Sequence, residues 1–367
     1  MRTNWITFDL TGMMVAAYLL LLLFITTSCL LAAQVGSVTD ALASLAREEP
    51  VSLAYCSLSL LFACTYPLGV FSDNMIRAEP VLVATYVALS TLLIALHHCV
   101  SKTALPRTKM ESAPICLLVL VLLALLMSVL RTSSDEVFVA QLTERAPRVL
   151  HYLLLLAALH RSLTSSLKKS DFLWYFLVIF ITTESAENNF IVLAAALLLA
   201  LHLRATEGVG AGHSSPLPLL DACAGVNALA ISRCVYFSTG HSFNFSSLKV
   251  SVAFTGTNTF NFLYGGIMLF INTFGSEIIA LLALRSHCQR RDDDNKNKNK
   301  NDNNNNSKHH PAIVACLWFK LYVATSSVLC NLVLRKHLMV FAVFAPKLIF
   351  ELSFFVGSSF AILFLCL

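Results

Sequence analysis

The feature that most constrains this chain is a series of long apolar segments. The first is residues 10–33, and a helix needs about 20 such residues to cross the hydrocarbon core of a bilayer. Only helices and closed barrels satisfy their backbone hydrogen bonds in lipid. The segments therefore predict an all-α, polytopic bundle of about ten or eleven membrane spans. The other apolar segments are residues 51–71, 81–96, 115–130, 149–159, 172–203, 219–237, 262–284, 312–334 and 338–367.

Composition supports a membrane bundle over a soluble fold. Hydrophobic residues make up 57% of the chain and charged residues 13%, whereas soluble domains carry about 25% charged residues. The net charge is +5, but the basic residues lie in short loops beside the spans, where lipid headgroups explain them. The sequence shows no basic surface with interleaved aromatic residues of the kind that nucleic-acid binding needs. Nucleic acid is therefore not an expected partner.

One long hydrophilic stretch, residues 285–311, interrupts the apolar pattern. Its centre is a low-complexity run of Asp, Asn and Lys, which predicts a disordered loop. The loop would divide a membrane helix bundle, residues 1–284, from a C-terminal membrane helix pair, residues 312–367.

The apolar segment 172–203 contains a polar interruption with two acidic residues, Glu184 and Glu187. It is either one long span with a polar middle or two short helices that meet at a turn. The two glutamates lie one helical turn apart. They could bind a cation, pair with a basic residue of another helix, or cap a helix turn at the membrane interface.

The sequence carries no recognisable catalytic or metal-binding motif. Outside the hydrophilic loop, no Asp has a second Asp or a His at ligand spacing. A Gly-rich phosphate loop, a nucleophile elbow and an HExxH motif are all missing. The eleven cysteines form no CxxC pair, and most lie within apolar segments, as expected of small buried hydrophobes. We therefore assign no catalytic residue and no metal ligand.

Polar residues at membrane depth are costly and are therefore candidates for function. Arg233 lies in an otherwise apolar segment, where it could clamp a phosphate or extend to the membrane surface. Asn272 belongs to a stripe of Asn and Gly residues, which fits either close helix packing or a groove for lipid headgroups.

The last apolar segment contains Pro346, Lys347 and Glu351. The proline should kink the helix, and Lys347 and Glu351 are spaced i,i+4, which allows them to pair on one helix face. Such a helix either fixes helix packing or faces a polar substrate.

Residues 335–351, RKHLMVFAVFAPKLIFE, resemble a signature near the C-terminus of GPI ethanolamine phosphate transferases. The similarity is greatest to the type 3 enzymes, the PIG-O-like branch. Residues 236–242, YFSTGHS, with His241, resemble the FFxTGHQ segment of that branch, and residues 245–256 and 272–274 also follow family patterns. The resemblance covers residues 230–365. The first two hundred residues are similar to the family only in forming membrane helices.

The resemblance implies a multi-pass protein of the endoplasmic reticulum membrane that acts in GPI-anchor biosynthesis. Enzymes of this family transfer phosphoethanolamine from phosphatidylethanolamine to a mannose of the GPI precursor. Their metal ions and threonine nucleophile belong to a large lumenal domain that these residues do not include. The resemblance therefore implies no cofactor and no catalytic residue here, and leaves open whether the chain itself is an enzyme.

Two explanations follow from the resemblance. The chain is either the membrane half of a split or truncated transferase, or a separate relative that binds the GPI lipid or stabilises a complex. We favour a membrane portion that binds phosphatidylethanolamine and the GPI precursor between its helices. Its expected partners are these lipids, together with a separate catalytic chain or a small stabilising membrane subunit. The alternatives are a polytopic transporter and a structural scaffold subunit of an endoplasmic reticulum membrane complex. The candidate lipid-binding residues are Arg233, His241, Asn272, Lys347 and Glu351.

Overall fold

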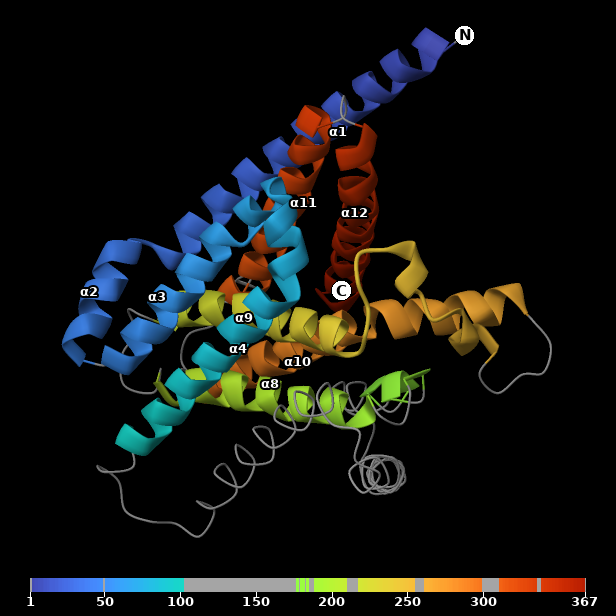
Figure 1. Cartoon of the computed structure of the whole chain (residues 1–367). Coiled ribbons are helices and arrows are strands. Elements are labelled where there is room, and N and C mark those ends of the chain that lie inside the picture. The colour runs from blue at the N-terminus through green and yellow to red at the C-terminus, as the bar shows by residue number, and fades with distance from the viewer. Residues whose placement is uncertain are drawn as a thin grey trace.

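The computed structural model describes residues 2–101 apart from 49, residues 176–209 apart from 178, 182 and 185–187, and residues 217–254, 261–298, 310–334 and 338–366. Within these ranges the regular structure is helical (Figure 1). The predicted spans 115–130 and 149–159 lie outside the described residues, as does Glu187. The α-helices are α1 (Arg2–Val35), α2 (Val38–Glu48), α3 (Pro50–Thr65), α4 (Asp73–Ser101), α8 (Asn189–Val209), α9 (Leu217–Ser238), α10 (Phe262–Lys298), α11 (Pro311–Leu334) and α12 (Leu338–Cys366).

Six of the described helices are long and apolar enough to cross a membrane. This confirms the predicted class of fold, a bundle of membrane helices. It does not establish the predicted number of ten or eleven spans. The candidate spans are Met14–Val35, Val51–Gly69, Ala78–Ala95, Pro218–Ser238, Phe262–Arg291 and Pro311–Val333.

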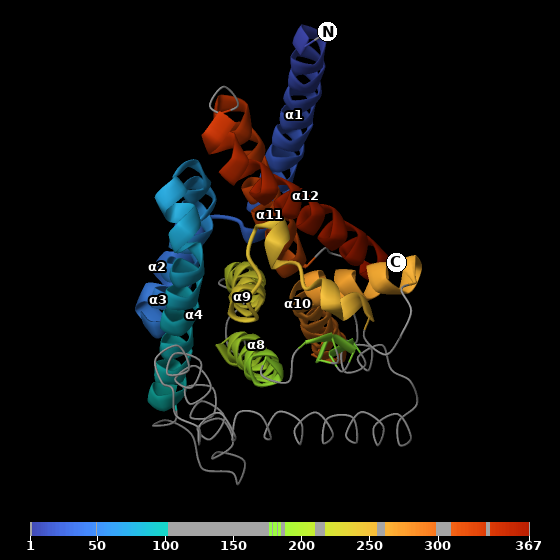
Figure 2. The ribbon, with the colours of Figure 1, turned by 45° about the vertical axis from the view of Figure 1, so that its right-hand side comes forward.

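Helix α9 forms the centre of the bundle. In its most apolar window 94% of the residues are buried, compared with 11% for α1. It packs against α8, α10 and α11 and also contacts α3 and α4. In Figure 1, α8, α9 and α10 run across the view, while α1, α11 and α12 cross them steeply. Figure 2 looks more nearly along α8 and α9 and shows α8 beside α9.

Two glycines allow close contacts, one between α9 and α11 and the other between α10 and Phe180. At Gly225 of α9, a Cβ atom would lie 2.3 Å from the backbone oxygen of Ala312 on α11. At Gly275 of α10, it would lie 2.1 Å from the ring of Phe180. Small residues allow the backbones of membrane helices to approach closely. Gly275 belongs to the stripe of Asn and Gly residues that contains Asn272, so its close contact supports the packing interpretation at that position.

Buried hydrogen bonds also join the helices around α9. Tyr86 of α4 donates to the Asn227 side-chain oxygen over 2.7 Å, and the Asn227 amide donates to Ser59 of α3 over 2.8 Å. These bonds link three helices through one amide. In membrane proteins such a bond contributes about 0.6 kcal/mol on average.

The hydrophilic stretch begins inside a helix. Helix α10 continues through Lys298, so the first part of the predicted loop, from Arg285, is helical. Residues 299–309 lie outside the described residues, and their disorder stays a prediction. Helix α11 packs against α1 and α9 as well as α12. The C-terminal helix pair is thus part of the same bundle as the preceding helices.

Short 3₁₀ turns at Phe245–Ser247 and Val250–Phe254 lie between α9 and α10. Helix α9 ends at Ser238, and Gly240, two residues beyond, has a φ of 87°, a conformation that favours glycine. Helix α10 begins after Asn261, whose side-chain oxygen accepts the backbone N–H groups of Leu263 and Tyr264. This N-cap fixes the start of α10. The connection is therefore anchored at both ends.

Candidate functional site

The first part of the candidate site is an ion pair between α12 and α4. Lys347 of α12 donates to the carboxylate of Glu79 on α4, and Tyr66 donates to the other oxygen of that carboxylate. All three side chains are buried. The predicted pairing of Lys347 with Glu351 is wrong, because each of these residues instead pairs with a different helix. An i,i+4 pair stabilises a helix only slightly, whereas a buried charge requires a close partner.

The second part joins α12 to the central helix α9. Arg233 donates to the carboxylate of Glu351, and their side chains are 4% and 1% exposed. The alternative in which Arg233 extends to the membrane surface is therefore wrong. The Arg233 guanidinium lies 4.4 Å from the ring centroid of Phe354 and 5.2 Å from that of Phe243. Both distances are within the range of a cation–π interaction.

The third part joins α10, α11 and α12. Lys320 of α11 donates to the carboxylate of Glu277 on α10, and Ser358 of α12 donates to its second oxygen. The ammonium group of Lys320 also lies 4.9 Å from the ring centroid of Phe354.

The three ion pairs share two aromatic rings. Arg233 and Lys320 both face Phe354, while Arg233 and Lys347 both face Phe243. We call this set the buried charge cluster. Its three positive and three negative groups give it no net charge, so each desolvated ion has a counterion. Its charged residues are Glu79, Arg233, Glu277, Lys320, Lys347 and Glu351.

Glu184 forms a second polar centre, at the break between two helical stretches. The segment is helical at residue 183, bends at Glu184, turns at Asn188 and continues as α8. The interpretation of residues 172–203 as two helices that meet at a turn therefore fits the described residues. Glu184 accepts hydrogen bonds from Lys249 over 2.8 Å, Asn272 over 2.7 Å and Asn188 over 3.0 Å. Pairing with a basic residue from another segment is thus the arrangement observed.

Burial opposes ionisation of Glu184, but its polar neighbours outweigh that effect. The nearby His241 ring, whose Nε2 lies 3.6 Å from the carboxylate, and the charge of Lys249 hold the pKa of Glu184 below its usual value. Through its hydrogen bonds the carboxylate joins α10, the connection after α9 and Asn188, the residue before α8. We call Glu184, Asn188, His241, Lys249 and Asn272 the Glu184 centre.

The structure divides the five predicted site residues between these two clusters. Arg233, Lys347 and Glu351 belong to the buried charge cluster, whereas His241 and Asn272 belong to the Glu184 centre. Tyr236 lies between the clusters. Its ring stacks on His241 at 5.1 Å between centroids and meets Phe354 edge-on at 5.4 Å. All five predicted residues are at most 4% exposed.

Sequence reasoning missed half of the buried charge cluster, namely Glu79, Glu277 and Lys320. Glu277 and Lys320 are single charges within the predicted spans 262–284 and 312–334, whereas Glu79 follows Asp73 and Arg77 at the start of α4. The signal that selected Arg233 applies equally to Glu277 and Lys320, because all three interrupt predicted spans. Glu79 lies just before the predicted span 81–96 and gave no such signal.

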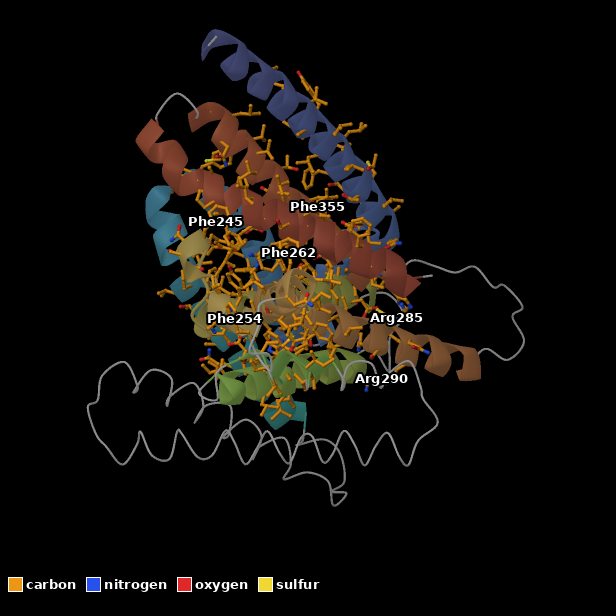
Figure 3. The ribbon with its side chains drawn as sticks, turned by 90° about the vertical axis from the view of Figure 1, so that its right-hand side faces the viewer. Phe245, Phe254, Phe262, Arg285, Arg290 and Phe355 are labelled. Atoms are coloured by element: carbon orange, nitrogen blue, oxygen red, sulfur yellow. The ribbon has the colours of Figure 1, made fainter. Side chains whose placement is uncertain are left out.

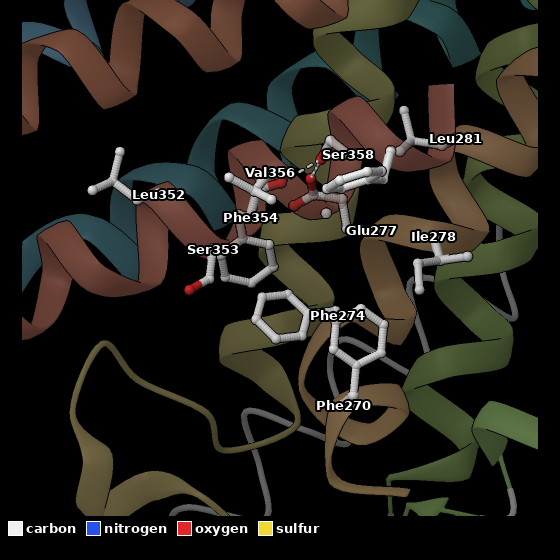
Figure 4. A pocket seen from close by; sticks show the side chains of 12 residues that line it. Phe270, Phe274, Glu277, Ile278, Leu281, Leu352, Ser353, Phe354, Val356 and Ser358 are labelled. Atoms are coloured by element: carbon white, nitrogen blue, oxygen red, sulfur yellow. Dashed lines mark hydrogen bonds between the residues drawn. The ribbon is translucent and has the colours of Figure 1, made fainter. Parts of the chain in front are cut away.

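A cleft adjoins the buried charge cluster between α10 and α12 (Figure 4). Its volume is about 750 Å³, within the range of pockets that hold small molecules. Figure 4 shows Glu277 and Ser358 joined by a hydrogen bond at one end and the rings of Phe270 and Phe274 at the other. The residues that line it are Phe270, Phe274, Glu277, Ile278, Leu281, Leu352, Ser353, Phe354, Val356, Gly357, Ser358 and Phe360.

The fold and these clusters define a class, a multi-pass membrane protein whose helices are joined by buried, mutually neutralised charges. The family model for the membrane region of GPI ethanolamine phosphate transferases matches residues 81–366. The chain therefore belongs to this family. No curated protein and no solved structure matches the chain. The match begins well before residue 230, so the prediction that the early residues resemble the family only as membrane helices is wrong from residue 81 onward.

Proposed function

We propose that this chain is the membrane portion of a GPI ethanolamine phosphate transferase and that it binds the lipid substrates of the reaction. The observation that supports this proposal most strongly is the family match over residues 81–366. The substrates would be phosphatidylethanolamine and the GPI precursor, and the site of action the endoplasmic reticulum membrane. Transfer of phosphoethanolamine would take place in a metal-dependent lumenal catalytic unit, and the helices described here would present the lipids to it.

In this proposal, the predicted site residues act mainly by holding the helices in place. Arg233, Lys347 and Glu351 direct their charged groups at protein partners from other helices. Removing one partner of a buried ion pair costs about 3–5 kcal/mol, because the other charge is left desolvated and alone. A lipid groove formed by α10 and α12 would lose its shape if α12 lost these contacts.

Complementation tests this proposal. In cells that lack the native gene, the protein with Arg233→Ala or Lys347→Ala should fail to restore surface GPI-anchored proteins, measured by flow cytometry. A matched control is Arg290→Ala, a basic residue that is exposed on α10 outside the buried charge cluster. Full surface display with both cluster variants would refute a role for these residues in the pathway.

Charge exchange separates a positioning role from direct contact with a headgroup. The double variant Arg233→Glu with Glu351→Arg keeps an ion pair between α9 and α12 but moves the guanidinium to the other helix. If the pair positions helices, the double variant should restore more surface display than either single variant. If Arg233 binds a phosphate directly, the exchange should give no recovery.

The proposed partners are a separate catalytic chain or a small stabilising membrane subunit. Affinity purification of the tagged protein in a mild detergent, followed by mass spectrometry, would detect either one. We expect a stoichiometric membrane partner that is lost when α12 is displaced by Lys347→Ala. Purification of the intact wild-type protein without any such partner would refute this part of the proposal.

A further inference from the structure

We propose that the cleft between α10 and α12 holds one acyl chain of a bilayer phospholipid, which enters sideways from the membrane. The proposal extends the lipid-binding role proposed above by assigning a place and a chemical class to one bound group. It depends only on the membrane architecture and the shape of the cleft. It can therefore fail while the role in GPI-anchor biosynthesis holds, and the reverse is also true.

The depth of the cleft favours hydrocarbon. Its α10 wall extends from Phe270 to Leu281, which is the middle of the candidate span Phe262–Arg291. On the outer side, Phe270, Val356 and Phe360 are 45%, 48% and 68% exposed. Phe270 lies within that candidate span, and a large apolar side chain exposed within a span faces lipid, since water is excluded there. The cleft therefore opens toward the acyl chains of the bilayer.

The chemistry of the lining also favours an acyl chain over a headgroup. Most of the wall is aromatic or aliphatic. The carboxylate at one end, Glu277, already accepts hydrogen bonds from Lys320 and Ser358, one at each oxygen. Figure 4 shows the Ser353 hydroxyl pointing away from Glu277 and Phe274. A headgroup in the cleft would have to break the internal pairs, whereas an acyl chain leaves them intact.

The inner wall is held in place before any lipid binds. Phe354 lines the cleft and is 2% exposed, and its ring centroid lies 4.4 Å from the Arg233 guanidinium and 4.9 Å from the Lys320 ammonium group. It also packs edge-on against Phe274 at 4.7 Å between centroids. A preformed wall lowers the entropy lost on binding. An empty apolar cavity would forfeit the dispersion contacts of its lining, so occupation by a lipid chain is favoured even though the bilayer itself is apolar.

Gly357 provides a direct test because it lines the cleft, so a side chain introduced there can occupy the cleft. A Cβ atom added at Gly357 would meet no atom within 4 Å, so Gly357→Leu should fill the cleft without moving the wall. Gly266→Leu is the matched control. It makes the same change on α10, again with no atom within 4 Å of the added Cβ atom, and Gly266 does not line the cleft.

The experiment uses phospholipids that carry a photoactivatable diazirine on one acyl chain, incorporated into vesicles with the purified full-length protein. After illumination, mass spectrometry identifies the labelled peptides. We expect label concentrated on the lining residues of α10 and α12, reduced at least fivefold by Gly357→Leu and unchanged by Gly266→Leu. Probes with ethanolamine and choline headgroups should label equally, because the cleft is proposed to contact only the chain.

Three outcomes would overturn the proposal. Label spread evenly over the lipid-facing surfaces would mean that no chain is held in the cleft. Unchanged labelling of α10 and α12 in Gly357→Leu would mean that the label reports general lipid contact. Labelling by the ethanolamine probe alone would identify a headgroup site instead. If labelling matches the proposal but Arg233→Ala and Lys347→Ala both restore full surface display, the acyl-chain site stands and the proposed role in GPI-anchor biosynthesis does not.

Discussion

At the scale of single residues, the buried carboxylates are the most informative groups. Glu79, Glu277 and Glu351 each face one cation from a different helix. Glu79 and Glu277 also accept a hydroxyl hydrogen bond on the second oxygen. A buried ion pair is stable only when geometry and additional hydrogen bonds offset the loss of hydration. Glu79 and Glu277 meet this requirement, because both oxygens of each carboxylate accept a hydrogen bond. Glu351 meets it less fully, because its Oε1 has no hydrogen-bond partner.

Removing the charge of Glu79 should destabilise the protein strongly. Glu79→Gln leaves the Lys347 ammonium group buried beside a neutral amide, which is expected to cost about 3–5 kcal/mol. Thermal unfolding of the detergent-purified protein, followed by size-exclusion chromatography, measures the loss. The double variant Glu79→Gln with Lys347→Met removes both charges and should regain most of the stability. Equal instability of the single and double variants would refute pairing as the cause.

Stability should depend on acidity through Glu184. Its pKa is lowered in the folded protein, so the folded state binds the proton more weakly than the unfolded state does. Its stabilising contribution is complete well above the usual value of 4.5 and is lost as the pH falls through the lower, folded-state pKa. Thermal midpoints measured across this acidic range should therefore fall less steeply in Glu184→Gln. Lys249 and His241 face the same carboxylate, so Lys249→Met should reduce the pH dependence partly. Identical slopes in all three proteins would contradict the assignment.

At the scale of helices, two kinds of contact determine the arrangement together. They are the close approach of helices at glycine residues and the ion pairs between helices. Apolar length predicted both ends of α9, α11 and α12 to within two residues, because the extent of a hydrophobic segment is a local property. It did not predict the polar ends of α4 and α10. The helix break at Glu184 was visible as one of two alternatives. The partners of Lys347 and Glu351 were not predictable in the same way. Pairing between α12 and both α4 and α9 depends on how helices distant in sequence are packed, and the nearest charge along the chain proved to be the wrong partner.

Glycine substitutions test the close approach of helices. Gly275→Ala places a Cβ atom 2.1 Å from the Phe180 ring, and such overpacking is expected to cost about 1–3 kcal/mol. Gly266→Ala on the same helix meets no atom within 4 Å and should gain about 0.5–1 kcal/mol from the restricted unfolded chain. Thermal midpoints of the two variants should therefore move in opposite directions. A stable Gly275→Ala protein would show that the Phe180 side chain can move aside.

At the scale of the whole molecule, burial is uneven. Helix α9 is enclosed by its neighbours, whereas α1 packs mainly on α11 and exposes most of its surface. Figure 3 shows α1 on the outside of the bundle. It also labels Phe245 and Phe254 in the connection from α9 to α10, and Phe262 at the start of α10. This difference in burial fits a bundle whose central helix carries polar groups and whose outer helices face lipid.

Chemical labelling tests the position of α1. A cysteine at Tyr18, which is 68% exposed, should react with a membrane-soluble maleimide in a background without native cysteines. A cysteine at the adjacent residue Ala17, which is 8% exposed, should react at least tenfold more slowly. A charged, water-soluble maleimide should label neither residue. Rapid reaction of Tyr18→Cys with the charged reagent would show that this part of α1 faces water.

The buried charge cluster also has a consequence for biogenesis. During synthesis, α4 and α9 enter the membrane carrying Glu79 and Arg233, whose ionic partners both belong to α12. Until α12 follows, one negative and one positive charge remain without their counterions in an apolar environment, which is costly. The Lys320–Glu277 pair can form earlier, but its third member, Ser358, also arrives with α12. Insertion of α12 thus supplies the counterions of α4 and α9 together and converts an intermediate with unpaired buried charges into a neutral interior.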